Sequence, residues 1–531
     1  MSKEVRVRFA PSPTGNVHIG NIRAAIFNYL FARHNGGKFL LRVEDTDKER
    51  STQEAVDNLL KCMDWLALEH DEEVFYQSSQ EQAHISIANR LVEEGKAYRA
   101  TKGDGGEVVL FRIPQVTENC SNIVKLGDAS QDLHPEATTK IDKTGLTFFL
   151  VSRKGKAVPQ ENMCLAGFHK MKLFNEAGEE VFDLESNLDA LLSGDAEFAI
   201  EGAVKMTFVR HAVSFTDMIK GELKKPLDSI KDLVIVKSNG SPLFHLANIC
   251  DDITQKMSHI IRGDDHVENT YRHVLLYHAL GEEAPVYAHL PMIVNKSGKP
   301  YSKRDGDAYV GDFKSNGYLA DTLFNYLILL GWSPGNDQEK VTREEAIKLF
   351  ELERCKSTAA QMDMDKLYNL NGQYLAELTD EAFFAMVQEE IKAYDWYNGD
   401  TTYLKEVSAL MHSRTKLITQ LETWDYFFTE GITQTDEKKV QKVLNKEIVI
   451  AALTTFVETA KDIDFTDENI EATARAAAEA NELNPGKINQ PLRLSATAAG
   501  GGAELFPTLA LVGKEKVLAR IQKTIADLSE K

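Results

Sequence analysis

The stretch 5–47 constrains the fold more than any other part of the chain. Residues 5–9 alternate between apolar and basic side chains, which predicts a strand. A turn with two prolines breaks that strand, and a helix is predicted from about Gly20. Residues 39–43 form a second apolar run, which ends in the acidic residues 44–47. A strand, a helix and a strand in this order predict a right-handed unit of a doubly wound parallel sheet.

The carboxyl ends of such strands are where ligands bind in open α/β sheets. Polar side chains collect at that edge, namely Arg8, Ser12, His18 and Glu44. An arginine and a glutamate on neighbouring strand ends can bind the carboxylate and the ammonium of one amino acid. The alternative is a plain turn with a capping histidine and a surface salt bridge.

The start of the predicted helix is suited to a nucleotide. We expect unpaired N–H groups and the positive end of the helix dipole to face phosphate beside His18. Gly20 has no side chain, so a flat base can approach the backbone there.

These motifs carry a resemblance to a known family. The run APSPTGNVHIGN, followed by RVEDTD, resembles the first signature of the class I aminoacyl-tRNA synthetases. More closely, it resembles the bacterial-type glutamyl-tRNA synthetases. The run 299–306 resembles their second signature, although Pro300 stands where the family usually has lysine. The resemblance implies ATP binding by His18, Gly20, Ser302, Lys303 and Arg304. It also implies catalytic roles for His18 and for Lys303, a loop lysine suited to the leaving diphosphate.

The resemblance also assigns an amino-acid site. The implied glutamate-binding residues are Arg8, Ser12, Glu44, Asn248 and Arg262. The two arginines would hold the side-chain carboxylate, because a planar guanidinium donates two hydrogen bonds at once. Ser12 and Glu44 would take the amino group, and Asn248 would help to position the amino acid. Phe244 stands where the family usually has tyrosine, so a hydroxyl contact is lost.

The fold class that follows is multi-domain. An α/β Rossmann-like catalytic domain carries a mixed α/β insertion and is followed by an all-α carboxyl-terminal domain. The predicted parts are a first catalytic half (1–100), a divergent inserted acceptor-binding-like domain (101–204), a second catalytic half with the signature loop (205–320), a stem-contact region (321–375) and a helical anticodon-binding domain (376–531). In the last part, the resemblance makes Arg414 a candidate to contact the anticodon. The alternative is an ordinary exposed helix arginine.

Composition limits the partners. The formal net charge is −20, so a tRNA partner requires local basic patches on an acidic body. The five cysteines are widely spaced, so we expect no zinc site and a reducing compartment. No apolar run has the length of a membrane span and no signal-peptide pattern is present. We expect a cytoplasmic monomer with no membrane association.

The implied reaction is tRNA aminoacylation. ATP activates L-glutamate to glutamyl-adenylate, and the glutamyl group then passes to the 3′ end of tRNA(Glu), releasing AMP and diphosphate. We expect Mg²⁺ with the nucleotide, bound mainly by phosphates and water. No protein nucleophile is required, because such chemistry depends on positioning and electrostatics.

The sequence is also compatible with other functions. One is an enzyme that also charges tRNA(Gln), and another is a catalytically silent tRNA-binding paralogue. A small nucleotidylyltransferase would lack the helical carboxyl-terminal part. An enzyme that glutamylates a modified tRNA base would resemble only the amino-terminal half, so residues 376–531 argue against it.

Overall fold

The chain forms two compact units. The computed structural model describes residues 4–47, 51–101, 105–115, 120–151, 157–159, 163–335, 337–432 and 437–529. The first unit contains Met1–Gly311 and Leu327–Met362, and the second contains Asp312–Tyr326 and Asp363–Lys531.

A parallel sheet forms the centre of the first unit. Its strands are β1 (Arg6–Phe9), β2 (Lys38–Val43), β3 (Phe75–Tyr76), β16 (His259–Gly263) and β17 (Val286–Leu290). Strands β1, β2 and β3 are parallel neighbours, and β16 pairs with β17 in parallel. The N–H of Ser258 donates to the Arg6 carbonyl at 3.0 Å, which places β16 beside β1. The chain order therefore reverses between β1 and β16, and a ligand crevice is expected at such a point.

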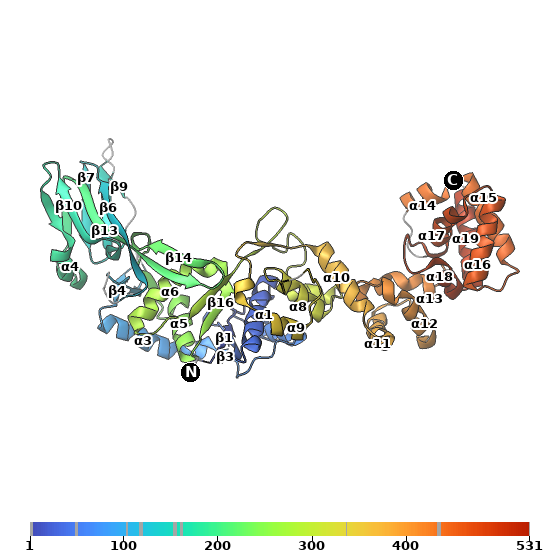
Figure 1. The fold of residues 1–531 in the computed structure, drawn as a ribbon, viewed down its shortest axis with the longest axis horizontal. Coiled ribbons are helices and arrows are strands. Elements are labelled where there is room, and N and C mark those ends of the chain that lie inside the picture. Colours follow the sequence, from blue (N-terminus) through green and yellow to red (C-terminus); the bar gives the residue numbers. More distant parts are fainter. Residues whose placement is uncertain are drawn as a thin grey trace. The chain divides into compact units, whose positions relative to one another are not determined.

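Helices pack against this sheet (Figure 1). They are α1 (Ile19–His34), α2 (Gln53–Trp65), α3 (Glu81–Glu93), α5 (Phe244–Thr254) and α6 (Val267–Leu280), while α9 (Arg343–Leu349) packs on α1. Helix α1 is capped by His18 and buries Ile22, Ile26 and Leu30. It ends at His34 with Asn35 as its C-cap, and the next residue, Gly36, has a φ of 62°, a backbone conformation that favours glycine.

A β-rich subdomain is inserted into the first unit. It contains β6 (Ile123–Asp132), β7 (Ala137–Asp142), β8 (Gly145–Val151), β9 (Ala157–Pro159), β10 (His169–Asn175), β11 (Glu180–Asp183), α4 (Leu184–Ser193) and β12 (Phe198–Glu201). Its core includes Phe148, Phe168 and Leu173. Residues 102–104, 116–119, 152–156 and 160–162 of the predicted insertion lie outside the described residues.

One long strand joins this subdomain to the catalytic sheet. Strand β13 (Ala203–Asp217) pairs with β6 and β10 at its start and with β14 (Gly221–Pro226) near its end. Asp217, its last residue, pairs in parallel with Tyr287 of β17. Separately, β4 (Ala97–Thr101), β5 (Glu107–Phe111) and β15 (Leu233–Val236) form a small antiparallel sheet.

The remaining part of the first unit carries the signature loop. Strand β18 (Ile293–Val294) pairs with β19 (Ala360–Gln361), and the loop 299–306 follows β18. The division between the units falls within helices α7 (Val310–Ser315) and α8 (Ala320–Leu329).

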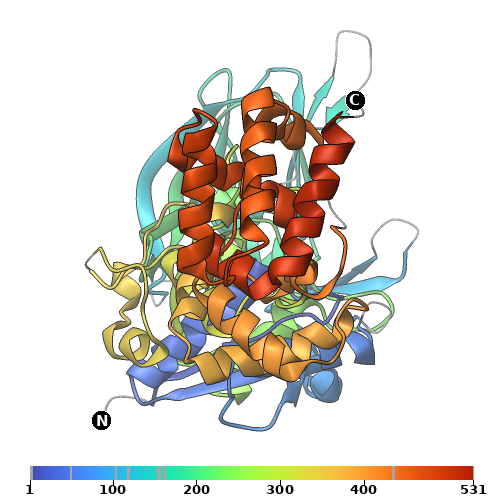
Figure 2. The same cartoon turned by 90° about the vertical axis from the view of Figure 1, so that its right-hand side faces the viewer.

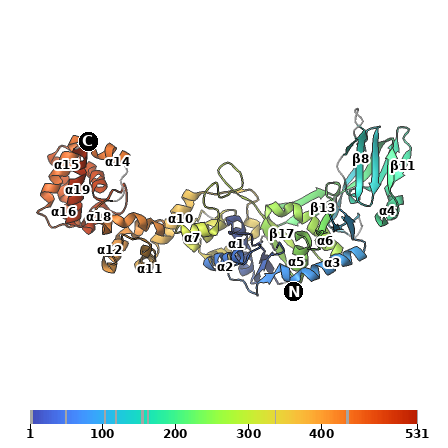
Figure 3. The same ribbon diagram turned by 180° about the vertical axis from the view of Figure 1, so that it is seen from behind.

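The second unit is helical in its described residues (Figures 2 and 3). Its helices are α10 (Met364–Ala376), α11 (Asp380–Glu390), α12 (Thr401–Met411), α13 (Asp425–Phe428), α14 (Glu437–Leu444), α15 (Glu447–Ala460), α16 (Asp467–Ala480), α17 (Asn489–Thr497), α18 (Leu505–Val512) and α19 (Lys514–Ser529). Trp424, Phe427, Leu453 and Phe456 belong to its apolar core. No helix among the described residues is long and apolar enough to cross a membrane.

One helix of this unit ends earlier than its pattern suggests. The apolar periodicity predicts a helix over 404–421, but α12 ends at Met411 and two 3-10 turns follow. His412 hydrogen-bonds the Leu375 carbonyl at 2.8 Å and stacks on Phe383 at a ring separation of 4.2 Å. These tertiary contacts replace the next helical turn.

Candidate active site

A cavity of about 650 Å³ opens at the carboxyl ends of the parallel strands. One side of it is lined by Arg8, Ser12, Glu44, Asn248 and Arg262. Another side is lined by His18, Gly20, Pro300 and Tyr301. The five residues predicted to bind glutamate thus share one cavity with two of those predicted to bind ATP.

A buried charge network supports one wall. Arg8 Nε donates to Asp252 Oδ1 at 2.9 Å, and Arg42 Nη1 donates to the same oxygen at 2.6 Å. Glu44 Oε1 accepts from Asn248 Nδ2 at 2.7 Å and from Arg42 Nη2 at 3.2 Å. The network fixes Arg8 and Glu44 before any ligand binds.

The electrostatics of Asp252 follow from these contacts. Burial alone would raise the pKa of Asp252, but Arg42 and Arg8 outweigh this effect and lower it. Asp252 is therefore held as a carboxylate inside the protein. Removing it would leave two buried guanidinium groups without their shared partner.

Arg262 lies in a different electrostatic setting. Its side chain donates to Thr270 Oγ1 at 2.7 Å, to His289 Nε2 at 3.3 Å and to the His266 carbonyl at 3.4 Å. All three acceptors are neutral, and no carboxylate among the described residues forms an ion pair with Arg262. Burial lowers the pKa of Arg262 to about 10. A buried cation without a counter-ion, facing a cavity, is suited to an anionic ligand.

His18 begins α1 and contacts the signature loop. Its Nδ1 accepts from the Gly20 N–H at 3.0 Å, so the ring proton is on Nε2. Nε2 then donates to the Tyr301 carbonyl at 3.2 Å. Burial lowers the pKa of His18, which keeps the ring neutral. A Cβ added at Gly20 would come within 3.2 Å of the His18 ring, so alanine there would press on the histidine.

The expectation of unpaired N–H groups at this helix start is wrong. The Ile19 N–H donates to the Ala308 carbonyl at 2.9 Å, and the Asn21 N–H donates to the His18 carbonyl at 3.0 Å. The histidine cap takes the Gly20 N–H. The chain around Ala308 returns to this turn and uses its donors, which sequence periodicity cannot reveal. The helix dipole remains.

The predicted triphosphate loop lies beside the cavity. Lys303 and Arg304 are exposed and are not among the residues that line it. Lys303 Nζ is 5.8 Å from the centre of the Tyr309 ring, and that ring contacts the His18 ring at 6.1 Å. Ser302 Oγ donates to Asp305 Oδ2 at 2.9 Å and stabilises the turn. The lysine is thus close to the histidine turn but on a surface loop.

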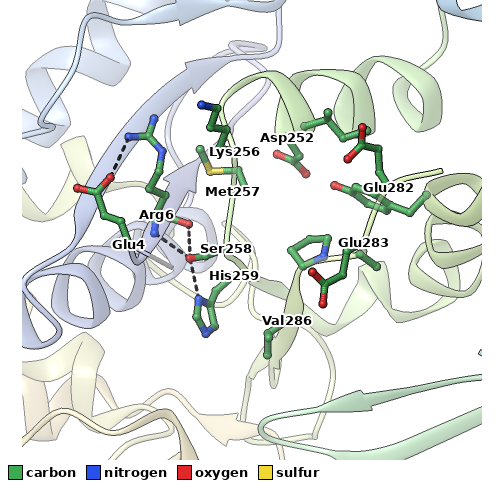
Figure 4. A pocket seen from close by; sticks show the side chains of 14 residues that line it. Glu4, Arg6, Asp252, Lys256, Met257, Ser258, His259, Glu282, Glu283 and Val286 are labelled. Atoms are coloured by element: carbon green, nitrogen blue, oxygen red, sulfur yellow. Dashed lines mark hydrogen bonds and ion pairs between the residues drawn. The ribbon is translucent and has the colours of Figure 1, made fainter. Parts of the chain in front are cut away.

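A second cavity of about 570 Å³ lies near the amino-terminal ends of β1, β16 and β17 (Figure 4). Arg6, Lys256 and Ser258 line it, and Ser258 Oγ accepts from the Arg6 N–H at 2.8 Å. It contains none of the predicted site residues. It shares only Asp252 with the charge network described above.

Comparison with protein families gives a match on both units. The model described as "tRNA synthetases class I (E and Q), catalytic domain" matches residues 4–145 and 196–369. A model described as "Anticodon binding domain" matches residues 374–525. The chain belongs to the class I tRNA synthetases of the E and Q family.

Curated relatives and solved structures agree with this family. The chain is 34% identical to the glutamate–tRNA ligase of Francisella philomiragia, and the match covers 99% of both chains. It is 33% identical to glutamate–tRNA ligase 1 of Gluconobacter oxydans, with 98% of both covered. A crystal structure of a glutamate tRNA ligase from Elizabethkingia meningosepticum, in complex with its amino acid, superposes with a TM-score of 0.67 at 25% identity. It covers 99% of this chain and 100% of its own.

Several residues of this synthetase site were missed by the sequence analysis. Arg42 and Asp252 hold the side chains of Arg8 and Glu44 in place. Thr270 and His289 accept hydrogen bonds from Arg262. The pair Asp251–Asp252 on an otherwise apolar helix was a usable signal, since carboxylates are rarely buried unless they are paired.

Phe244 lines the active-site cavity of this synthetase. Its ring lies within 5.8 Å of the ring centres of His245, His266 and His273. His245 Nδ1 and His273 Nε2 are 3.1 Å apart. Burial lowers the pKa of His245 and of His266 to about 4, so these rings are neutral at physiological pH.

No cluster of three or more histidine, cysteine, aspartate or glutamate side chains suited to a metal occurs in the part of the chain that the structure describes. Two carboxylates at the cavity each have one oxygen engaged, since Glu44 Oε1 accepts from Asn248 and Asp264 Oδ2 from Lys220. These donors fit an ion that arrives with the nucleotide better than a protein-built metal cage.

Arg414 lies in the anticodon-binding domain of this synthetase. It is exposed in a 3-10 turn (His412–Arg414), not within a helix. Its charge contributes to lowering the pKa of Arg493, after burial, so the two arginines are close. Together they form a local basic pair on an acidic protein.

Proposed function

We propose that this synthetase is a glutamate–tRNA ligase that makes glutamyl-adenylate from L-glutamate and ATP and transfers the glutamyl group to tRNA(Glu). The observation that carries the proposal is the cavity in which Arg8, Glu44 and Arg262 meet. Glu44 is a hydrogen-bonded carboxylate, Arg8 is paired with Asp252, and Arg262 has no ion-pair partner among the described residues. Together these groups suit an amino acid with a second carboxylate.

Glutamate recognition depends on Arg262 and Arg8. The side-chain carboxylate supplies the direct ion-pair partner that Arg262 lacks among the described residues. Glu44 accepts from the ammonium group through Oε2, because Oε1 is occupied by Asn248 and Arg42. Glutamine would offer a neutral amide to two buried cations, so its binding is disfavoured.

In the activation step, an α-carboxylate oxygen of glutamate attacks the α-phosphorus of ATP. A new P–O bond forms, the bond to the leaving diphosphate breaks, and the products are glutamyl-adenylate and diphosphate. His18 stays neutral and donates to the nucleotide from Nε2, which exchanges the Tyr301 carbonyl for the ligand. Lys303 moves from the surface to the diphosphate and stabilises its developing charge. Mg²⁺ bound by the phosphates and water would neutralise further charge.

In the transfer step, the 2′-hydroxyl of the terminal tRNA ribose attacks the acyl carbon. AMP leaves, and the hydroxyl proton passes to the released phosphate or to water. The helical domain binds the anticodon region, with Arg414 as a contact, and the β-rich insertion binds the acceptor end. We retain the domain boundaries 1–100, 101–204, 205–320, 321–375 and 376–531 as part of this proposal.

The test is an aminoacylation assay with total tRNA, ATP and radiolabelled glutamate. We expect charging by the wild type and a loss of roughly 100-fold or more in kcat for Lys303→Ala, since an electrostatic contact made in the transition state is removed. Lys296→Ala is the matched control, because Lys296 is an exposed lysine of the same loop region, and it should keep full activity. Absence of charging with glutamate and every other amino acid would favour the silent paralogue.

Two finer points belong to the same proposal. Sorting the labelled product by tRNA species shows whether tRNA(Gln) is charged, and we expect tRNA(Glu) alone. We also expect a cytoplasmic monomer, which a native mass measurement and cell fractionation test directly.

A further inference from the structure

Three neighbouring strands of the catalytic sheet end in a buried chain of polar side chains. Asp217 is the last residue of β13, His289 lies on β17 and Arg262 on β16; β13 and β17 are neighbours in Figure 3. Their exposed fractions are 1%, 0% and 7%. In the register of β16 and β17, Arg262 is directly opposite His289.

The proton on His289 can be placed from its partners. Nδ1 is 2.6 Å from Asp217 Oδ2, and a carboxylate can only accept, so Nδ1 carries the proton. On the other side, Nε2 is 3.3 Å from Arg262 Nε, and a guanidinium can only donate. Nε2 is therefore an acceptor, and His289 is neutral. Burial lowers the pKa of His289, in agreement with a neutral ring.

The second acceptor of Arg262 belongs to the same group. Thr270 Oγ1 accepts from Arg262 Nη2 at 2.7 Å and lies 2.9 Å from His289 Nε2. Arg262 is thus fixed at two of its nitrogens by neutral acceptors. Such acceptors orient the guanidinium without cancelling its charge, which stays available for an anion in the cavity.

We propose that Asp217 and His289 are positioning residues for glutamate binding: Asp217 sets the His289 tautomer, and that tautomer orients Arg262 toward the substrate carboxylate. The inference rests on the proposed function, because it takes Arg262 to bind glutamate. It adds a buried Asp–His pair that touches neither substrate but determines how tightly glutamate is held.

Asp217→Asn should change the orientation of Arg262 while keeping the backbone hydrogen bonds that Asp217 makes in the fold. Oδ1 of Asp217 accepts from the backbone N–H groups of Ile219 and Lys220, both at 2.9 Å, and of His289 at 3.3 Å. An asparagine must keep its carbonyl oxygen there, so its amide NH₂ faces His289 Nδ1. The ring proton then moves to Nε2, so the His289 Nε2–H and the Arg262 Nε–H, two donors, face each other. A buried Asp→Asn change causes the same wrong tautomer in a catalytic triad.

The kinetic test compares Asp217→Asn with Asp232→Asn. Asp232 also accepts from a backbone N–H, that of Ile113 at 2.9 Å, and from Tyr98 at 3.0 Å, but it does not line the active-site cavity. We expect Asp217→Asn to raise the KM for glutamate roughly 10–100-fold, as loss of a partner behind a ligating group does. The KM for ATP should not change, and Asp232→Asn should change neither. Equal KM values for glutamate in wild type and Asp217→Asn would overturn the proposal.

A spectroscopic test does not depend on the folding of that variant. ¹⁵N-histidine NMR of the wild type should show the His289 proton on Nδ1, with the signal assigned by its loss in His289→Gln. A proton on Nε2 would overturn the proposal. Thr270→Val, which removes the other acceptor, should also raise the KM for glutamate. Failure of the proposed function looks different, because the wild type itself would then not charge tRNA with glutamate.

Discussion

Two buried arginines, one in each unit, are held in opposite ways. Arg520 on α19 is 4% exposed and Arg262 is 7% exposed. Arg520 donates to four main-chain carbonyls, those of Tyr426 at 2.9 Å, Thr429 at 2.6 Å, Glu430 at 3.2 Å and Ala496 at 2.8 Å. Arg262 has one carbonyl at 3.4 Å and two neutral side-chain acceptors, and it lines a cavity.

The difference is the one we expect between a structural cation and the cation that we propose binds glutamate. The donors of Arg520 connect four positions of the chain, so its hydrogen-bonding capacity stabilises the fold. Arg262 keeps charge and donor capacity for a ligand, which costs stability while the site is empty. Function and stability should therefore respond in opposite directions when each arginine is replaced.

Arg520→Met should have the largest effect. It removes a buried charged donor and leaves several carbonyls unsatisfied, which we expect to cost about 3–5 kcal/mol of unfolding free energy. Hydrogen exchange in peptides from α17 and α19 measures the loss within the second unit. The exposed Arg475 on α16 provides the control, since Arg475→Met should change stability by less than about 0.5 kcal/mol. If hydrogen exchange in these peptides is the same in Arg520→Met as in the wild type, Arg520 does not stabilise the second unit.

Arg262→Met should reverse this pattern. Losing a charge-assisted contact to the substrate should lower kcat/KM for glutamate by roughly 100–1,000-fold, or about 2.7–4 kcal/mol. The unfolding free energy without ligand should stay equal or rise, because an unpaired buried charge is removed. Arg262→Lys, which keeps the charge but not the planar fork, should fall between the two. A clear loss of stability in Arg262→Met would show that Arg262 is structural after all.

Acid should lower the stability of the first unit more than that of the second. Thirteen of the chain's 14 histidines precede residue 312, and the second unit holds only His412. Burial lowers the pKa of His245 to about 4, whereas an unfolded histidine has a pKa of about 6.5. The unfolded state therefore binds protons first, and this stability is present above about pH 6.5 and lost as pH falls toward 4.

His245 alone should account for a loss of about 2 kcal/mol in the first unit between pH 6.5 and pH 5, since each pKa unit is worth about 1.36 kcal/mol. Hydrogen exchange at both pH values, compared between peptides of α5 and of α15, is the measurement. His245→Asn should reduce the pH dependence of protection in α5 and leave the protection of α15 unchanged. Equal losses of protection in both units would contradict the prediction.

Arg414→Ala should have the smallest effect. An exposed arginine that contacts one tRNA base is worth about 1–3 kcal/mol, so kcat/KM for tRNA should fall at least 5-fold. The KM values for ATP and glutamate should stay the same, because these substrates bind in the other unit. Lys405→Ala, an exposed cation on α12, is the control. Equal effects of the two variants would leave Arg414 as an ordinary surface arginine.

Local patterns of the chain were sufficient for most elements. The alternation at 5–9, the prolines after it and the apolar helix positions predicted β1, α1 and β2, and the structure confirms them to within a residue or two. The same reasoning predicted too long a helix at 404–421, because contacts of His412 with Leu375 and Phe383 end α12. Local propensity is overruled where distant groups offer better partners.

The sequence by itself determined the family, the order of the domains and the residues that gather at the strand ends, because strand and helix periods are properties of neighbouring residues. Only the tertiary structure decided which charges are neutralised and which are left for a ligand. Asp252 reaches Arg8 across 244 residues of chain, and Arg262 is left with neutral acceptors from two other elements. Pairing and desolvation depend on where distant segments meet, and they leave Arg8 paired with a carboxylate and Arg262 without one.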